Sequence, residues 1–322
     1  MTQPATSPRA FAWMSASAAG FALMNFLAHV ASREVHWTLI VATRALVGAA
    51  VAYGIARVRG ATLVVRDRRG LLLRSGFGTI SMCCTFYALG SPELPLGDTV
   101  TLLNTTPVFL AVLAPVLLGE RGGRRVLIAL PPAITGLVLI VRPSFLFHRL
   151  SLSLSPGALV AASVAVLGAF SASIAWAALR RIGPRESAEG ITLWFSLFAA
   201  TAALLLAVRH LPIYVPSGGA VAAMLAAGAC GGLAQIAVTR AYALERAARV
   251  AGLAYLTVVV DAILGALALH EWPSWLTVSG MALIVTGGLV VTVASVREHV
   301  RPRAKSSRTL PPPPDRAPTS SP

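Results

Sequence analysis

Long apolar runs separated by short polar segments occupy most of the chain between residues 10 and 296. Each run is close to the roughly 20 residues that an α-helix needs to cross about 30 Å of hydrocarbon. Run length and the charged residues between runs separate the helices more clearly than periodicity does. The pattern therefore predicts an all-α membrane protein with ten transmembrane helices. They are expected at residues 10–32, 36–57, 70–90, 96–119, 124–142, 156–179, 187–209, 219–243, 249–270 and 275–296.

Composition supports a membrane protein over a soluble one. The mean hydropathy is +0.74 and only 12% of the residues are charged, which is too little charge for a soluble chain of 322 residues. The net charge of +15 is carried by loops between apolar runs, where basic residues orient a protein in the bilayer. We therefore expect the lipid bilayer as a partner and no nucleic acid.

Basic residues alternate between successive loops. With a cytoplasmic N-terminus, Arg44 and Arg240 lie inside spans, and nearly all the others, Arg74 included, count as cytoplasmic. The opposite loops hold only Arg33, Arg142, Arg149 and Arg209. This asymmetry predicts a multi-pass protein with both termini in the cytoplasm. Lys305 is the one lysine among 27 basic residues, a bias typical of bacterial chains from GC-rich genomes, so we expect the bacterial inner membrane.

The chain also shows a weak internal repeat, in which residues 96–142 align without a gap onto residues 247–293. Glu120 matches Glu271 at the end of one span, and a Thr-Gly pair matches in the next span. Five spans per half is an odd number, so the second half is expected to be inverted relative to the first. Two inverted five-helix repeats of this kind are typical of secondary transporters, whose halves exchange conformations around a central site.

These boundaries divide the chain into five parts. Residues 1–9 form a cytoplasmic N-terminus, residues 10–142 the first repeat, residues 143–155 a linker, and residues 156–296 the second repeat. Residues 297–322 are basic and proline-rich without apolar periodicity, so we expect a disordered cytoplasmic tail.

The first half carries a family resemblance. The stretch FYALGSPELPLGDTVTLLNTTPVFLAVLAPVLLGER, which begins at Phe86, resembles the first repeat of the EamA-type family of the drug/metabolite transporter superfamily. The shared pattern is an Ala-Leu helix end, a short loop, and a helix with a proline, here Pro107, that closes in Leu-Gly-Glu at Glu120. The second half departs from it, with Val258 where a second proline would stand. The resemblance implies ten helices in two repeats and gradient-driven transport of a small metabolite, without identifying that metabolite.

Asp261 is the strongest functional candidate, because it lies near the centre of a predicted span. A carboxylate there costs roughly 2.5–3.5 kcal/mol to insert, so such a residue usually faces a cavity or a partner. Its equivalent in the repeat is Leu110, so the fold does not demand an acid at this position. Two interpretations stay open: coupling of protons or binding of a cationic substrate group, and a hydrogen-bonded packing residue.

Other polar and aromatic groups are weaker candidates for contacts with substrate. Arg44 could bind a substrate anion or pair with Asp261, or extend to the headgroups. Asn25 is a further polar side chain in the first span. Trp176 and Tyr255 lie at membrane depth and could stack on a substrate.

Two candidates depend on the backbone around them. Asn104 lies one turn before Pro107, which is expected to kink its helix and to free carbonyl groups near a cavity. Asn104 could instead form hydrogen bonds between helices. Gln235 follows several glycines that more simply indicate close helix packing. A polar stripe on the third span could line a cavity or pack on a neighbour; it contains Ser75, Thr79, Cys83 and Tyr87.

The prediction is therefore a secondary active transporter that moves a small amino-acid-like, nucleoside-like or drug-like solute by alternating access, coupled to protons or to exchange. The alternatives are a channel or scaffold and an intramembrane enzyme. An intramembrane aspartyl protease needs two facing carboxylates, and only Asp261 lies deep inside a predicted span. The sequence also has no HExxH, GxSxG or phosphate-loop motif, which other classes of enzyme would need. The cysteines lack metal-site spacing, so we expect no metal and no cofactor. The oligomeric state, monomer or homodimer, stays open.

Overall fold

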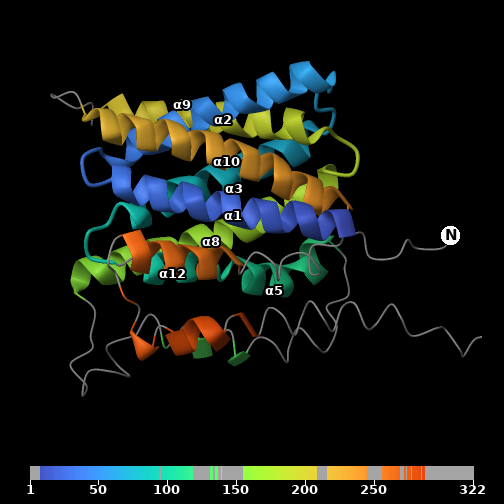
Figure 1. Cartoon of the computed structure of the whole chain (residues 1–322). Coiled ribbons are helices and arrows are strands. Elements are labelled where there is room, and N and C mark those ends of the chain that lie inside the picture. Colours follow the sequence, from blue (N-terminus) through green and yellow to red (C-terminus); the bar gives the residue numbers. More distant parts are fainter. Residues whose placement is uncertain are drawn as a thin grey trace, which may run out of the picture.

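The computed structural model describes residues 8–94, 96–118, 155–208, 216–244 and 256–268, with short pieces between 131 and 139 and between 272 and 286. Every regular element in this described part of the chain is an α-helix (Figure 1). The helices are α1 (Pro8–Ala31), α2 (Trp37–Arg59), α3 (Arg68–Leu89), α4 (Leu96–Leu103), α5 (Thr106–Leu118), α8 (Pro156–Ile182), α9 (Ala188–Ala207), α10 (Gly218–Leu244) and α12 (Leu256–Ala268). The all-helical prediction is thus confirmed for these residues, and the predicted span at 124–142 lies almost wholly outside them.

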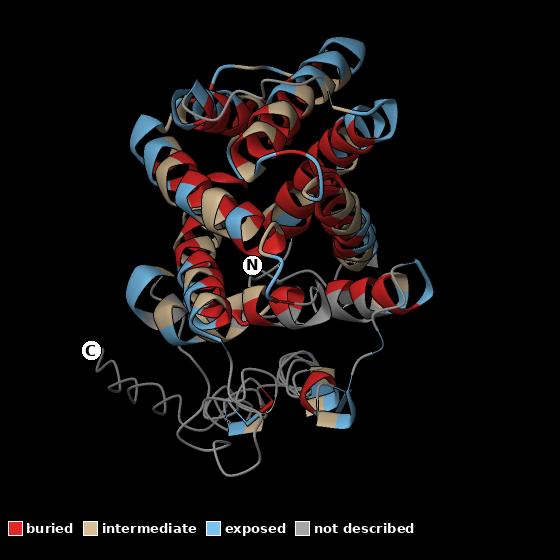
Figure 2. Cartoon of the chain, turned by 90° about the vertical axis from the view of Figure 1, so that its left-hand side faces the viewer, coloured by how far each residue is buried: buried red, intermediate tan, exposed pale blue. Residues whose placement is uncertain are grey.

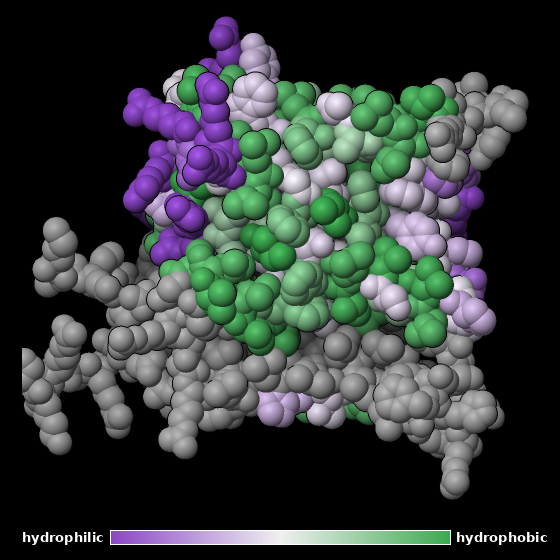
Figure 3. All heavy atoms as spheres, turned by 180° about the vertical axis from the view of Figure 1, so that it is seen from behind, coloured by the Kyte–Doolittle hydropathy of each residue, from purple (hydrophilic) through white to green (hydrophobic). Residues whose placement is uncertain are grey.

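Five of these helices, α1, α2, α8, α9 and α10, are long and apolar enough to cross a membrane. Figure 3 shows one face of the bundle, on which hydrophobic residues form a broad band between hydrophilic residues at the two ends. Several exposed arginines lie where α2 ends and α3 begins: Arg57, Arg59, Arg66, Arg68 and Arg69. An apolar belt with charged ends is the surface that a multi-pass membrane protein presents to lipid and water.

Local sequence signals determine where several helices begin and end. The Asp67 side chain accepts a hydrogen bond from Gly70 N–H at 2.9 Å and so caps α3, and Ser187 caps α9 in the same way. Ser155 caps α8, and Pro156 follows at the first position, where its missing N–H is not needed. α2 ends at Arg59 and is capped by Gly60, whose φ of 64° is a left-handed conformation that glycine adopts without strain.

The helices pack mainly in pairs that join distant parts of the chain. α1 packs on α10, α2 on α9, and α3 on α8. Buried residues face the middle of this bundle and exposed ones its periphery (Figure 2). Where α2 meets α10, a Cβ added at Gly232 would lie 3.0 Å from the Cα of Gly48. Small residues at such crossings let two backbones approach closely in the membrane, where packing rather than the hydrophobic effect holds helices together.

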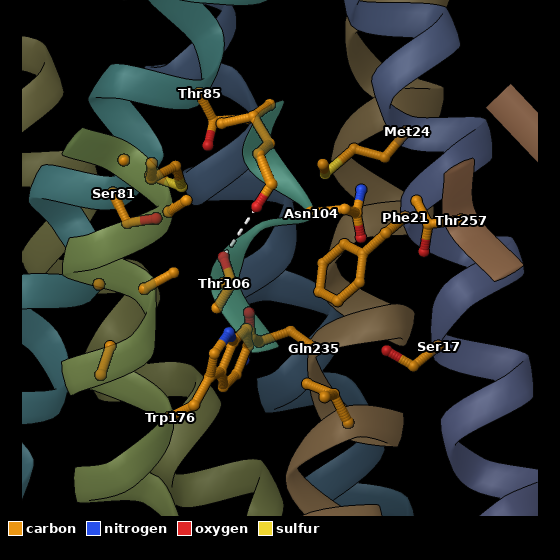
Figure 4. A pocket seen from close by; sticks show the side chains of 18 of the residues that line it. Ser17, Phe21, Met24, Ser81, Thr85, Asn104, Thr106, Trp176, Gln235 and Thr257 are labelled. Atoms are coloured by element: carbon orange, nitrogen blue, oxygen red, sulfur yellow. Dashed lines mark hydrogen bonds between the residues drawn. The ribbon is translucent and has the colours of Figure 1, made fainter. Parts of the chain in front are cut away.

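The predicted fourth span is wrong in one respect, because residues 96–118 form two helices rather than one kinked helix. α4 ends at Leu103, and a turn at Asn104 and Thr105 leads into α5. Pro107 is the second residue of α5 and cannot donate the backbone bond that would continue α4. The Leu103 carbonyl accepts a bond of 2.8 Å from the Thr106 hydroxyl instead (Figure 4). The carbonyl predicted to be freed for substrate is therefore satisfied within the chain.

Candidate functional site

A cavity of about 180 Å³ lies at mid-length of the bundle, between α1, α3, α8 and α10. Figure 4 shows Ser17, Phe21 and Met24 of α1 on one wall and Ser81 and Thr85 of α3 on the other, with Gln235 of α10 between them. The lining is mostly apolar with a few separated polar groups, which is the usual composition of a small-molecule site. Five residues predicted from the sequence line it: Asn25, Arg44, Asn104, Trp176 and Gln235.

Asp261 lies behind this lining rather than in it. Its side chain is fully buried in α12, and one carboxylate oxygen accepts a hydrogen bond of 3.1 Å from the Asn25 amide, which does line the cavity. The other carboxylate oxygen has no hydrogen-bond partner among the described residues. Thr257, one turn earlier on α12, lines the cavity and donates to the Ala18 carbonyl at 3.3 Å. Asn25 therefore separates the acid from the cavity in this conformation.

Arg44 points into the bundle and not to the headgroups. Its side chain is 5% exposed, and its guanidinium contacts the sulfur atoms of Met24 and Met82. A Cβ added at Gly231 of α10 would lie 3.0 Å from the Arg44 Nε, so the glycine makes room for this guanidinium. The described residues show no ion pair between Arg44 and Asp261, which was one of the predicted roles.

The prediction that Arg74 is one of the cytoplasmic charges is wrong, because this residue is buried in the bundle. Its side chain is 2% exposed and lines the cavity, with its guanidinium 4.8 Å from the Trp176 ring centroid and 4.2 Å from that of Phe195. A Cβ at Gly78, one turn further on α3, would overlap the Arg74 Nη1. The absent side chain at Gly78 is what lets the long arginine fold back into the bundle. The signal available in the sequence was this pair, an arginine four residues before a glycine on one helix face.

Asn104 and Gln235 line the cavity with different hydrogen bonding. The Asn104 amide donates to the Val100 carbonyl, one turn earlier in α4, at 2.8 Å, and among the described residues it forms no hydrogen bond to another helix. The Gln235 Nε2 is buried and has no partner in the described part of the chain. Gly228, Gly231 and Gly232 face residues of α1 and α2 closely, which confirms the interpretation of these glycines as packing residues.

Trp176 and Tyr242 close the end of the cavity nearer the start of α1. Their rings stack with centroids 5.6 Å apart and an interplanar angle of 20°. Trp176 thus lines the cavity as predicted, but its ring already stacks on Tyr242 and contacts the Arg74 guanidinium. Tyr255, the other predicted aromatic contact, lies outside the described residues. None of the polar stripe from Ser75 to Tyr87 lines the cavity, because the adjoining face of α3 does so.

Beyond the stacked rings, Arg240 of α10 forms an ion pair with Glu189 of α9, and its guanidinium lies 4.7 Å from the Trp13 ring centroid. The Arg240 guanidinium is therefore held inside the protein by Glu189 and does not extend to the headgroups. Glu189, near the start of α9, is a closer partner for the Arg240 guanidinium than the water at the membrane surface. Glu189 escaped the sequence analysis because it stands at a helix start, where acidic residues are common for electrostatic reasons.

Removal of the Glu189 charge should destabilise the protein. Glu189→Ala leaves the Arg240 guanidinium without its partner, and breaking a buried pair costs about 3–5 kcal/mol. The loss here should fall at or below that range, because 17% of the Arg240 side chain is exposed. The melting temperature in detergent measures it. Replacing both residues by leucine should recover most of the loss, and an equal loss in the double variant would contradict a role for the pair.

The sequence comparisons agree with this architecture. The model of the EamA-like transporter family matches the chain twice, over residues 8–142 and 159–293. The pseudopaline exporter CntI of Pseudomonas aeruginosa is 31% identical over 274 residues, which cover 84% of this chain and 92% of the exporter. The riboflavin transporter of Rhizobium johnstonii is 27% identical over 218 residues, which cover 67% of this chain and 68% of that protein.

A solved crystal structure of a protein has a similar fold, with a TM-score of 0.67 over 88% of this chain and 98% of that one. At 22% sequence identity it supports the fold alone. The two family matches span most of the chain, and the relatives named above are an exporter and a transporter. The chain belongs to the EamA-like transporter family.

Proposed function

We propose that this protein is a secondary transporter that carries a small metabolite across the bacterial inner membrane by alternating access. The observation that supports this most directly is a cavity with polar groups at mid-length of the bundle, enclosed by helices from both matched segments. A site at that depth can open to either side of the bilayer when two halves rock against each other. The transporters among its relatives favour transport over an enzyme or a scaffold.

The proposal includes ten helices in two inverted repeats. The family model matches two consecutive segments of similar length, as a duplicated chain would. The helix contacts are also symmetric. An operation that exchanges α1 with α8, α2 with α9 and α3 with α10 converts the α1–α10 contact into the α8–α3 contact. It leaves the α2–α9 contact unchanged. A two-fold axis in the membrane plane would produce this correspondence, which supports the proposed inverted repeats.

The exposed arginines support an orientation with the α2–α3 loop in the cytoplasm. That loop and the first turn of α3 carry Arg66 and Arg69, whereas the turn between α1 and α2 carries Arg33. We therefore propose that both termini are cytoplasmic, as the positive-inside rule predicts for an even number of spans.

Asp261 is proposed as the coupling group. It is a buried acid next to the cavity, and Asn25 is the side chain through which it reaches the lining. Movement of α1 relative to α12 would break this bond and open the carboxyl group to the cavity. A proton could then be exchanged in one conformation and held in the other.

Counterflow in proteoliposomes tests the transport proposal. Vesicles containing the purified full chain are preloaded with one unlabelled metabolite and diluted into trace labelled metabolite of the same kind, across a panel of amino acids, nucleosides and organic acids. A carrier should accumulate label transiently and saturably for at least one compound. Uptake that rises linearly with concentration for every compound would indicate a channel, and no uptake by correctly folded protein would contradict transport.

A further inference from the structure

The cavity contains two buried arginines whose charges the described residues do not neutralise. Arg44 and Arg74 are 5% and 2% exposed, and neither forms an ion pair with a carboxylate in the described part of the chain. The Arg44 guanidinium meets two thioether sulfurs, and the Arg74 guanidinium meets two aromatic rings. Burying an ionised group without a partner is strongly unfavourable, so a structure that holds two such groups side by side needs a reason to keep them.

Their spacing follows from α3. The Arg74 Nη1 lies against Gly78, and the Arg44 Nη1 lies against Met82, four residues further along the same helix. At a rise of about 1.5 Å per residue, the two contacted residues are roughly 6 Å apart along α3, so the two guanidinium groups lie against neighbouring turns of the same helix. Both guanidinium groups belong to residues that line this cavity.

The surroundings leave these groups able to donate. The rings of Trp176 and Phe195 lie near the Arg74 guanidinium, and stacking of this kind uses the face of the cation and leaves its N–H edges free. The Arg74 Nε and the Gln235 Nε2 are buried and have no hydrogen-bond partner among the described atoms. Unused buried donors around one cavity are what an anionic ligand with several acceptor oxygens requires.

We infer that the substrate of the proposed transporter is a small organic di-acid, with one acidic group bound by Arg44 and the other by Arg74, and with Gln235 donating to the molecule between them. This inference rests on the proposed function and specifies its substrate class. Carboxylate and phosphate groups share the required chemistry, because both accept paired hydrogen bonds from a guanidinium. The cavity volume of about 180 Å³ is below the roughly 300–1,000 Å³ of sites for drug-sized ligands, which favours a small metabolite.

The first test compares the stability of the empty protein after three identical substitutions. Arg44→Met and Arg74→Met remove unpaired buried charges, so each should raise the melting temperature of the purified full chain in detergent. Arg240→Met is the matched control: this arginine is paired with Glu189, so its loss should lower the melting temperature. If Arg44 and Arg74 were structural, all three variants would melt at lower temperature, and that result would overturn the inference.

The second test measures binding directly, because a ligand that binds only the folded protein raises its melting temperature. Succinate and 3-phosphoglycerate present two acidic groups, butyrate presents one, and 1,4-diaminobutane has the length of succinate with the opposite charge. At equal ionic strength we expect a rise of several degrees with at least one di-acid, a smaller rise with butyrate, and none with the diamine. Arg44→Met and Arg74→Met should each abolish the di-acid response, whereas Arg240→Met should retain it.

The outcomes separate the inference from the function beneath it. A response to succinate alone or to 3-phosphoglycerate alone supports the di-acid class and identifies which acidic group is preferred. No response to either di-acid, together with saturable counterflow of a neutral or cationic metabolite, overturns the inference and leaves transport standing. Absence of counterflow for every class of compound contradicts the proposed function itself.

Discussion

Asp261→Asn is expected to leave substrate exchange across the bilayer intact but to abolish accumulation driven by a pH difference. Asparagine preserves a side-chain oxygen that accepts the hydrogen bond from Asn25, yet it cannot take up or release a proton. With one proton coupled per substrate, a difference of one pH unit supports about a tenfold concentration gradient, equivalent to 1.36 kcal/mol. Proteoliposomes with an imposed pH difference should therefore show about tenfold accumulation for the wild type and none for the variant.

Glu34→Gln is the matched control for this experiment, since it makes the same carboxyl-to-amide change at an exposed acid. Glu34 lies at the end of the bundle, where it accepts hydrogen bonds from Ser217, and it does not line the cavity. This variant should accumulate substrate as the wild type does. If Asp261→Asn also sustained a tenfold gradient, Asp261 would be a packing residue that ties α12 to α1.

Gly78→Val should reduce both transport and stability. A Cβ at this position would lie 2.8 Å from the Phe195 ring and would overlap the Arg74 guanidinium, so the side chain of Arg74 must leave its place. Overpacking of this kind costs about 1–3 kcal/mol in folding stability. Transport should fall at least about tenfold, the loss that accompanies removal of a contact worth about 1.4 kcal/mol.

The chain offers a control one half-turn away. Gly76→Val makes the same substitution on the same helix, but a Cβ at Gly76 meets no atom within 4 Å. It carries the same change in helix propensity without the collision. Initial rates of counterflow and melting temperatures should be close to wild type for Gly76→Val and clearly lower for Gly78→Val. Equal values for the two variants would show that Gly78 does not make space for Arg74.

Residues lining the cavity were predicted with uneven success. Asn25, Arg44, Asn104, Trp176 and Gln235 stood out because a polar or aromatic group inside an apolar run is conspicuous, and all of them line the cavity. Further polar lining residues did not stand out. Ser17, Ser81, Thr85 and Thr106 are small hydroxyl residues that occur throughout membrane helices, where they often bond to their own backbone.

Arg74 shows why some errors were unavoidable from the sequence alone. It stands six residues from the start of α3, where an arginine side chain is long enough either to reach water or to fold back into the bundle. Which of these occurs depends on Gly78 and on Phe195 of α9, a residue more than one hundred positions away. Arg240 presents the same ambiguity, and Glu189 of α9 resolves it.

The sequence by itself determined that the chain is helical and crosses a membrane many times, where most of the long helices among the described residues begin and end, and which family it resembles. These properties follow from local quantities, namely run length, loop charge and capping residues, because lipid requires each backbone segment to satisfy its own hydrogen bonds. Only the tertiary structure decided that Arg44 and Arg74 share one cavity, that Asn25 stands between Asp261 and that cavity, and that Glu189 holds Arg240. The direction of a long or polar side chain depends on the free space and the partners that other helices provide, and these are known only when the helices are packed.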